Sequence, residues 1–471
     1  MNREDLEKVY QYIDDNKDAI IEDLIKVARI ESVSDETSEV KPFGPGCRKV
    51  LDYMLGVGQR EGFRTANHEY YAGSIRYDVG NDKRLGILAH LDVVPAGDDW
   101  MVTKPYEPVI KEGLLFGRGT GDDKSAAIAG LYIMKAFRDL QIPLRSNIEL
   151  LLGCSEETGM ADMKYYREHY QAPDFTFVPD AGFSGAAGEF GRIRYILTSR
   201  KPLSDDFKDM FAGSAFNIVP NKANVVLKKE TGINYKDIPE GFEIRETEEG
   251  IAITAFGVTT HAAGPERGLN AVKVLTNGLL TLNLRESDRK ILEFIDNVNN
   301  DYYGSFLGID KTDEVSGQTV SSGTVLRFNE GRISLLNDCR CCVTDNPDRL
   351  EKNIRAKAKA WDYDVSVEEK SYGYALDVNG PIIQTIDRIF LEFSGITDRK
   401  IQIGKGGTYA GQLPNAFATG CVLNEKWGEK PEWLPAGHGG AHQPDEFINI
   451  NNYIRGIKLL ATMILEVDEI V

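Results

Sequence analysis

Hydrophobic spacing along the first part of the chain alternates between helix-like and strand-like segments. Apolar residues from Leu6 to Val27 recur at steps of three and four, which predicts helix, and a second helix is expected over about 47–60. Further along, short apolar runs predict buried strands, separated by stretches rich in helix formers. These strands are expected at 85–90, 147–154 and 174–180, and the intervening helices at 125–140 and 161–170. Such alternation predicts an α/β fold with a mostly parallel sheet and helices on both faces.

The middle of the chain has a different pattern. At 223–229 and 250–257 apolar and polar residues alternate as in half-exposed strands, and one long polar helix is expected near 271–299. After residue 377 the α/β pattern returns, with a helix at 380–393, a strand at 401–404 and an amphipathic helix near 452–466. We therefore expect an α/β catalytic domain, 1–184 and 377–471, that is interrupted by an inserted α+β domain at 185–376.

Composition narrows the class of protein. A length of 471 residues suits two or three domains, and 42% apolar with 27% charged residues is ordinary for a globular protein. The net charge of −18 argues against nucleic acids and anionic membranes as partners. Six scattered cysteines are too few for a disulfide scaffold and suggest reduced thiols in the cytoplasm. We expect no signal peptide and no membrane-spanning segment.

Carboxylate and imidazole side chains follow the predicted strand ends. His90 ends one strand, Glu156 and Glu157 follow the next, and Asp180 ends the third. Further candidates are Asp92, Asp122 in a glycine-rich loop, and His442 near the C-terminus. Ligands bind at the carboxyl ends of strands in open α/β sheets, so we expect these side chains at one rim. Taken singly, each could be an ordinary polar strand end, solvated face or turn, but together they suit zinc, with cobalt or manganese as substitutes.

Seven motifs in order extend this interpretation over nearly the whole chain. They are GILAHLDVVPAGDDW, GRGTGDDKSA, CSEETG, FVPDAGF, THAAGPERGLNA, GGTYA and AHQPDEF. Together they resemble the di-zinc metallopeptidase family that includes Xaa-His dipeptidases, carnosinases, aminoacylases, glutamate carboxypeptidases and desuccinylases. The bacterial PepV-type dipeptidases are the most similar subgroup.

The resemblance implies a centre with two Zn²⁺ ions per chain. His90, Asp122 and Asp180 would hold one ion, and Asp122, Glu157 and His442 the other, with Asp122 bridging. Glu156 would act as general base for a metal-bridging hydroxide, and Asp92 would orient the imidazole of His90. The peptide bond between Asp122 and Asp123 would be cis. The nearby His438 could be a solvent-facing residue, a substrate contact or a ligand in place of His442, and the motif context favours His442.

The inserted domain would act as a lid that contributes substrate contacts. The resemblance makes His261 an oxyanion stabiliser, Asn217 a substrate-binding residue, and Arg340 the clamp for the free carboxylate of the substrate. From the residues alone, a surface histidine in a loop is the favoured interpretation of His261, and Arg340 could equally be part of an ordinary ion pair. Gly406, Gly407 and Thr408 match a loop that can offer backbone N–H groups to the same carboxylate. The large size of the lid implies a doubled lid and a functional monomer.

The predicted activity is hydrolysis of the peptide bond of unblocked dipeptides. Aspartate at position 180, where related carboxypeptidases and desuccinylases usually have glutamate, resembles the dipeptidases and aminopeptidases. The alternative is an N-acyl amino acid deacylase or a carboxypeptidase of the same family, with the same metals. A remote alternative is a non-catalytic binding protein on this fold, although neither Glu156 nor any expected ligand is missing.

Overall fold

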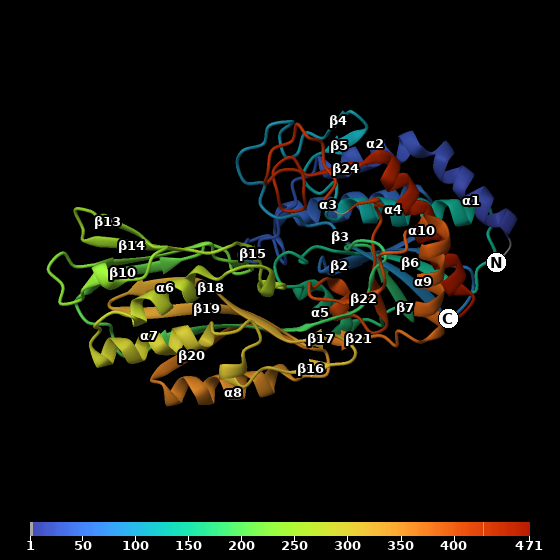
Figure 1. Cartoon of the computed structure of the whole chain (residues 1–471). Coiled ribbons are helices and arrows are strands. Elements are labelled where there is room, and N and C mark those ends of the chain that lie inside the picture. Colours follow the sequence, from blue (N-terminus) through green and yellow to red (C-terminus); the bar gives the residue numbers. More distant parts are fainter. Residues whose placement is uncertain (1–2, 427) are drawn as a thin grey trace. The chain divides into compact units, whose positions relative to one another are not determined.

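The computed structural model describes residues 3–426 and 428–471, and the chain divides into two compact units (Figure 1). The discontinuous unit contains the chain up to Gly188 together with Leu376–Val471. The inserted unit is Glu189–Ala375. Near the point of insertion, the backbone N–H of Leu376 donates to the carbonyl oxygen of Ala187 at 2.6 Å. The chain therefore leaves and re-enters the discontinuous unit at neighbouring positions.

The discontinuous unit is built around one mixed sheet. Its strand order is β1-β2-β6-β3-β7-β23-β8, and β22 also pairs with β8. The four central strands β6, β3, β7 and β23 run parallel, whereas β1, β2 and β8 pair antiparallel with their neighbours. The predicted, mainly parallel α/β sheet is thus confirmed at its centre. The strands are β1 (Arg64–His68), β2 (Ala72–Tyr77), β3 (Arg84–His90), β6 (Asn147–Gly153), β7 (Phe175–Val178), β8 (Ala186–Glu189), β22 (Gln402–Gly404) and β23 (Ala416–Ala418).

Helices cover both faces of this sheet. Gly58 of α3 lies so close to Ile75 of β2 that an added Cβ would approach the Ile75 side chain to 2.9 Å. Ser74, next to Ile75, lines a hollow with Tyr166 of α5. Neighbouring residues of a strand point to opposite faces, so α3 and α5 lie on opposite sides. The helices of this unit are α1 (Arg3–Asp15), α2 (Lys17–Ala28), α3 (Gly44–Arg60), α4 (Lys124–Asp139), α5 (Ala161–His169), η4 (Tyr409–Gln412), α9 (Pro381–Ser394) and α10 (Ile450–Asp468).

A small second sheet joins two loops that are distant in the sequence. It contains β4 (Val109–Lys111), β5 (Leu114–Phe116) and β24 (Phe447–Asn449). Phe447 of β24 pairs with Phe116 of β5. The segment that contains His442 therefore lies beside the segment that leads to Asp122. Strands of three residues are too short for hydrophobic periodicity, and the sequence did not predict them.

The inserted unit has an antiparallel sheet of eight strands, in the order β13-β14-β12-β10-β18-β19-β9-β20. Along β9, buried and half-buried residues alternate, as expected for a sheet with one covered face. The strands are β9 (Gly191–Ser199), β10 (Phe207–Ala212), β11 (Ile218–Val219), β12 (Lys222–Leu227), β13 (Glu243–Glu246), β14 (Ile251–Phe256), β15 (Thr260–His261), β16 (Thr312–Asp313), β17 (Gly317–Gln318), β18 (Val320–Asn329), β19 (Arg332–Cys341), β20 (Tyr363–Ser371) and β21 (Tyr374–Ala375). The helices are η1 (Tyr235–Asp237), η2 (Pro265–Arg267), α6 (Ala271–Leu280), α7 (Glu286–Val298), η3 (Ser305–Leu307) and α8 (Pro347–Ala360).

The prediction of a single long helix near 271–299 is wrong. The segment forms two helices, α6 and α7, separated by residues 281–285. The Arg289 guanidinium donates to the carbonyl oxygens of Leu280 and Leu282, both at 2.8 Å. The amide of Asn283 bonds the backbone of Asn234 and Gly232. The Arg289 contact satisfies a carbonyl oxygen that the end of α6 leaves unpaired, and the Asn283 contacts hold the linker against residues 232–234.

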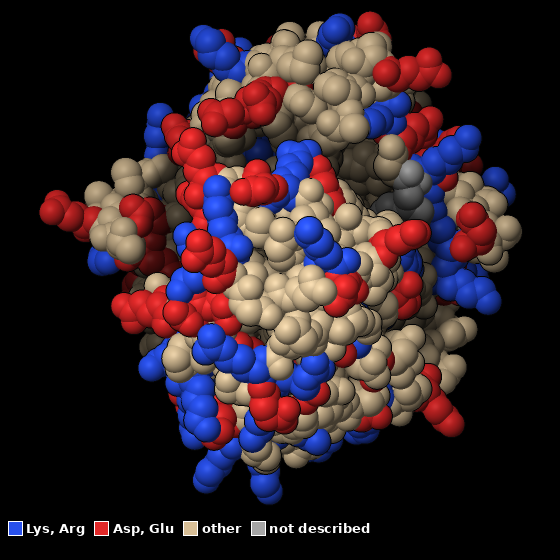
Figure 2. All heavy atoms as spheres, turned by 60° about the vertical axis from the view of Figure 1, so that its left-hand side comes forward, with Lys and Arg blue, Asp and Glu red and all other residues tan. Residues whose placement is uncertain are grey.

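Charged side chains of both signs are interspersed with other residues on the face drawn in Figure 2. This mixture is compatible with the chain's 55 basic and 73 acidic residues. Among the described residues, no helix has the length and apolar character needed to cross a membrane.

Candidate metal centre

Three groups of histidine and carboxylate side chains could each hold a metal ion. Within each group the candidate ligand atoms all lie within 4.8 Å of one another. The groups are His90, Asp122 and Asp180; Asp122, Glu157 and His442; and His90, Glu156 and Glu157. The structure thus brings together the five expected ligands and the expected base, from the ends of β3, β6 and β7 and from two loops. Asp122 is common to the first two groups.

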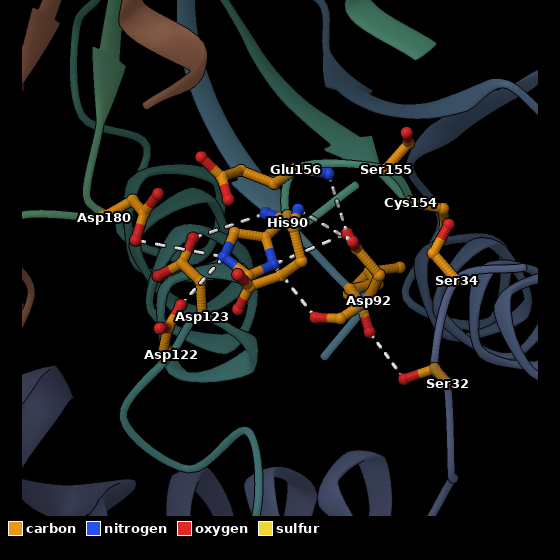
Figure 3. Close-up of polar contacts among 12 residues, drawn as sticks. Ser32, Ser34, His90, Asp92, Asp122, Asp123, Cys154, Ser155, Glu156 and Asp180 are labelled. Carbon is orange, nitrogen blue, oxygen red and sulfur yellow. Dashed lines mark hydrogen bonds and ion pairs between the residues drawn. The ribbon is translucent and has the colours of Figure 1, made fainter. Parts of the chain in front are cut away.

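The two carboxylate oxygens of Asp122 face two different histidines. Its Oδ1 lies 2.9 Å from His90 Nε2, and its Oδ2 lies 3.1 Å from His442 Nε2. His90 Nε2 is also 3.9 Å from Asp180 Oδ1, and Figure 3 shows both aspartates turned toward the His90 ring. His442 Nε2 lies 3.0 Å from Glu157 Oε1. Ligand atoms around a tetrahedral zinc ion are about 3.3 Å apart, so this spacing fits bound metal.

The electrostatics of the cluster also favour a bound cation. Burial by itself lowers the pKa of His90, but the carboxylates of Asp122 and Asp92 outweigh burial and raise it well above its usual value. Hydrogen bonds with Asp122 and Glu157 raise the pKa of His442 to about 10. Burial raises the pKa of Asp180 and of Glu156 well above their usual values. Buried carboxylates outnumber the imidazoles here, and divalent ions would supply the missing positive charge.

Asp92 contacts both the His90 ring and the loop that carries the two glutamates. His90 Nδ1 lies 2.9 Å from the backbone oxygen of Asp92 and 3.5 Å from its carboxylate (Figure 3). The same carboxylate accepts the backbone N–H groups of Glu156 and Glu157 at 3.2 and 3.1 Å. The proposed role of Asp92 in orienting the imidazole therefore has a geometric basis, and the structure adds a contact with the loop of the base.

A second buried carboxylate holds the start of this loop, and no pattern in the sequence indicated its role. Asp162 accepts the backbone N–H groups of Cys154 and Ser155 at 2.7 and 2.8 Å, and the Tyr409 hydroxyl donates to it. Burial, the largest effect, raises the pKa of Asp162 to about 7. Tyr409 directly follows Gly406, Gly407 and Thr408, of which the two glycines are exposed. The glycine-rich loop is thus connected through Tyr409 and Asp162 to the Glu156 loop.

His438 is absent from all three metal-ligand groups of the described residues. Its Nδ1 lies 2.7 Å from Asp445 Oδ2, and Asp445 also accepts the backbone N–H groups of Met101 and Val102. These contacts bind His438 to a neighbouring loop, whereas His442 faces Asp122 and Glu157. The Asp122–Asp123 peptide is cis, as the resemblance implied.

A cavity of about 720 Å³ reaches the metal-ligand groups. Its lining includes Asp122 and Asp180 together with the apolar side chains of Phe183, Cys421 and Val422. This cavity lies within the discontinuous unit. Asp122 and Asp180 are therefore accessible to a small molecule.

Three further candidates lie close together within the inserted unit. His261 of β15 pairs with Ile218 of β11, and the backbone N–H of Ala262 donates to the backbone carbonyl oxygen of Asn217 at 2.8 Å. Partial burial lowers the pKa of His261, and Arg340 and Arg192 lower it further. Arg192, which no sequence pattern indicated, lies directly opposite Arg340 in the pairing of β9 with β19.

Arg340 is buried and forms an ion pair within its own strand. Its Nε lies 2.6 Å from Asp338 Oδ1, and its Nη2 lies 3.0 Å from Asp338 Oδ2. Arg340 therefore does form the ordinary ion pair that the residues alone allowed. This ion pair also fixes the plane of the guanidinium, whose Nε and Nη2 both contact Asp338.

The chain resembles known proteins over nearly its whole length. The model of "Peptidase family M20/M25/M40" matches residues 86–466. The Beta-Ala-Xaa dipeptidase of Lactobacillus delbrueckii subsp. lactis is 31% identical over 471 residues, covering 96% of this chain and 97% of the relative. Human carnosine dipeptidase 1 has a similar structure, with a TM-score of 0.60 at 18% identity, covering 98% of this chain and 99% of that one. An M20 family metallo-carboxypeptidase from Sulfolobus solfataricus gives a TM-score of 0.56 at 16% identity, covering 96% and 99% of the two chains.

Proposed function

The chain belongs to peptidase family M20/M25/M40 and is a hydrolase of peptide bonds, and we propose that within this family it is a metal-dependent dipeptidase. Family membership implies use of a divalent metal. The observation that carries the proposal is the shared position of Asp122, one oxygen toward His90 and the other toward His442. Unblocked dipeptides are the proposed substrates, in keeping with the name of the Lactobacillus relative.

The proposed centre holds two ions, with zinc as the first choice and manganese or cobalt as substitutes. His90, Asp122 and Asp180 would hold one ion, and Asp122, Glu157 and His442 the other. When bound, the ions would polarise the amide carbonyl and lower the pKa of water at the site. Glu156 accepts a proton from the attacking water and passes it to the leaving amine nitrogen. Asp92 keeps Glu156 and His90 in place through the contacts described above.

The inserted unit would supply substrate contacts as a lid. His261 would stabilise the developing oxyanion, Asn217 would bind the substrate, and Arg340 would bind its free carboxylate. Gly406, Gly407 and Thr408 would offer backbone N–H groups to that carboxylate. The eight-stranded sheet supports a doubled lid and therefore a monomeric enzyme. The free thiols of all six cysteines support a cytoplasmic location.

A substrate panel tests the proposed activity. We expect the protein, loaded with Zn²⁺ or Mn²⁺, to cleave Ala-His and Leu-Leu at least 100-fold more efficiently than N-acetyl-Leu. The reason is that the proposed pocket accepts a free amine and a free carboxylate. Removal of metal with a chelator should abolish cleavage, and added ions should restore it. Preference for N-acetyl-Leu would support the deacylase instead, and release of C-terminal residues from longer peptides would support a carboxypeptidase.

The proposed carboxylate clamp predicts a selective effect of Arg340→Lys. Lysine keeps the charge but cannot make two parallel hydrogen bonds, so KM for Leu-Leu should rise about tenfold, or 1.4 kcal/mol. Steady-state kinetics should show no such rise for Leu-Leu amide, which lacks the carboxylate. Arg200→Lys is a matched control, because Arg200 forms an exposed ion pair with Asp364 in the same unit. An equal rise in KM for Leu-Leu amide would contradict the proposed role of Arg340 as a carboxylate clamp.

A further inference from the structure

Glu446 is a buried carboxylate that lies against the loop carrying Asp122. Its Oε1 accepts the backbone N–H groups of Gly121 and Asp122 at 2.7 and 3.1 Å. Its Oε2 accepts the N–H of Gly119 at 3.2 Å and Arg118 Nη1 at 2.7 Å. The residue is 1% exposed. One side chain thus satisfies four donors from a run of five residues.

These contacts join two segments that supply candidate ligands to the same metal group. Glu446 follows His442 by four residues, and its backbone oxygen accepts the N–H of Gly117 at 2.9 Å. Pairing of β24 with β5 continues directly from this point. Gly119 has a positive φ of 80°, a conformation in which glycine is favoured. The loop forms neither helix nor strand, and Glu446 accepts four of its hydrogen bonds, beside the turn bond from the Thr120 N–H to the Gly117 oxygen.

We propose that Glu446 is a positioning residue of the metal centre. It touches none of the candidate ligand atoms. Instead it fixes the backbone from Gly119 to Asp122, and this holds the Asp122 carboxylate where its two oxygens face His90 and His442. Partners of this kind around metal ligands typically change metal affinity 10- to 100-fold when they are lost. The inference rests on the proposed metal centre but not on the proposed substrate.

Glu446→Gln tests the proposal. The glutamine amide keeps the size of the side chain, but its NH₂ group cannot accept the N–H groups of Gly119 and Arg118. We expect Mn²⁺ to bind the chelator-treated full chain at least tenfold more weakly in calorimetric titration. Hydrogen–deuterium exchange of the 117–123 segment should be faster than in the parent protein before any metal is added. This second measurement reports the loop itself.

Glu149→Gln is a matched control for the loss of a buried ion pair. Glu149 is 2% exposed and pairs with Arg84 at 2.7 Å, the same distance as Glu446 with Arg118. It lies within β6 and outside the metal-ligand groups of the described residues. We expect Glu149→Gln to lose thermal stability but to bind Mn²⁺ as the parent does. Parent-like Mn²⁺ affinity of Glu446→Gln, or an equal loss in both variants, would overturn the proposal.

Glu446→Asp is a second variant for use if circular dichroism shows that Glu446→Gln does not fold. Glu446→Asp keeps the charge for Arg118 but withdraws the carboxylate from Gly121 and Asp122. It should also bind Mn²⁺ at least tenfold more weakly, and parent-like affinity would overturn the proposal. A parent protein that binds Mn²⁺ but cleaves no dipeptide would refute the substrate assignment and leave this inference standing. A parent that binds no ion would refute both.

Discussion

Asp122→Ala is expected to remove both divalent ions and all measurable peptidase activity. The reason is geometric, because one oxygen of Asp122 lies 2.9 Å from His90 Nε2 and the other 3.1 Å from His442 Nε2. Neither ligand group is complete without this carboxylate. Metal content per chain, measured by atomic spectroscopy after dialysis, should fall from two ions in the parent to none.

The same substitution at Asp180 provides the matched comparison. Asp180 belongs to only one of the three groups among the described residues, together with His90 and Asp122. Asp180→Ala should therefore lose one ion and keep the ion held by Asp122, Glu157 and His442. Two tightly bound ions in Asp122→Ala would contradict the bridging role. Equal losses in the two variants would show that the ions bind cooperatively rather than through a shared ligand.

Glu156→Gln is expected to lower kcat by about 10²–10⁴-fold, the usual contribution of a general base. Glutamine is nearly the same size but cannot accept the proton of the attacking water. KM for Leu-Leu and the metal content should stay near the parent values, because Glu156 is proposed not to bind metal. Pre-steady-state and steady-state rates on the metal-loaded variant, with metal analysis of the same sample, measure kcat, KM and the metal content.

The structure makes this experiment decisive, because Glu156 also lies in a possible ligand group with His90 and Glu157. Glu157→Gln, one residue away, is the matched control and should lose an ion as well as activity. A Glu156→Gln variant that loses an ion would make Glu156 a ligand. A variant with parent-like kcat would remove it as the base.

The centre of the fold could be predicted because its strands are buried on both faces. β3 and β6 are almost continuous apolar runs, and such runs mark parallel strands covered by helices. Once their direction was known, His90, Glu156 and Asp180 had to lie at one edge. Their roles came from the motif resemblance and stay proposals until the ions and the kinetics are measured.

Contacts between distant segments could not be predicted in the same way. No pattern in the sequence distinguishes Glu446 and Asp162 from ordinary surface carboxylates, and aspartate and glutamate are usually exposed. Only the folded chain shows that each is buried against backbone N–H groups of a loop with a candidate ligand or base. The motif AHQPDEF contained Glu446, but its spacing carried no information about which loop it would meet.

The break between α6 and α7 shows a further limit of periodicity. Residues on both sides of 281–285 keep the same helical spacing, so the pattern predicted one helix. The contacts of Asn283 and Arg289 with backbone groups stabilise the break between the two helices. The Asn283 contacts depend on tertiary structure, which the hydrophobic pattern does not contain.

The hydrogen bond between Leu376 and Ala187 has a consequence for how this architecture tolerates change. Because the two ends of the inserted unit meet, this unit is connected to the discontinuous unit in the same way as a long loop with neighbouring ends. The entropy lost on closing a loop grows only with the logarithm of its length, so doubling it costs about 0.6 kcal/mol. Large changes in the size of the insert should therefore have only a small effect on the folding free energy of the sheet that holds His90 and Asp180. The insert could therefore change in size, or be exchanged as a whole, while the sheet that positions the candidate metal ligands stays the same.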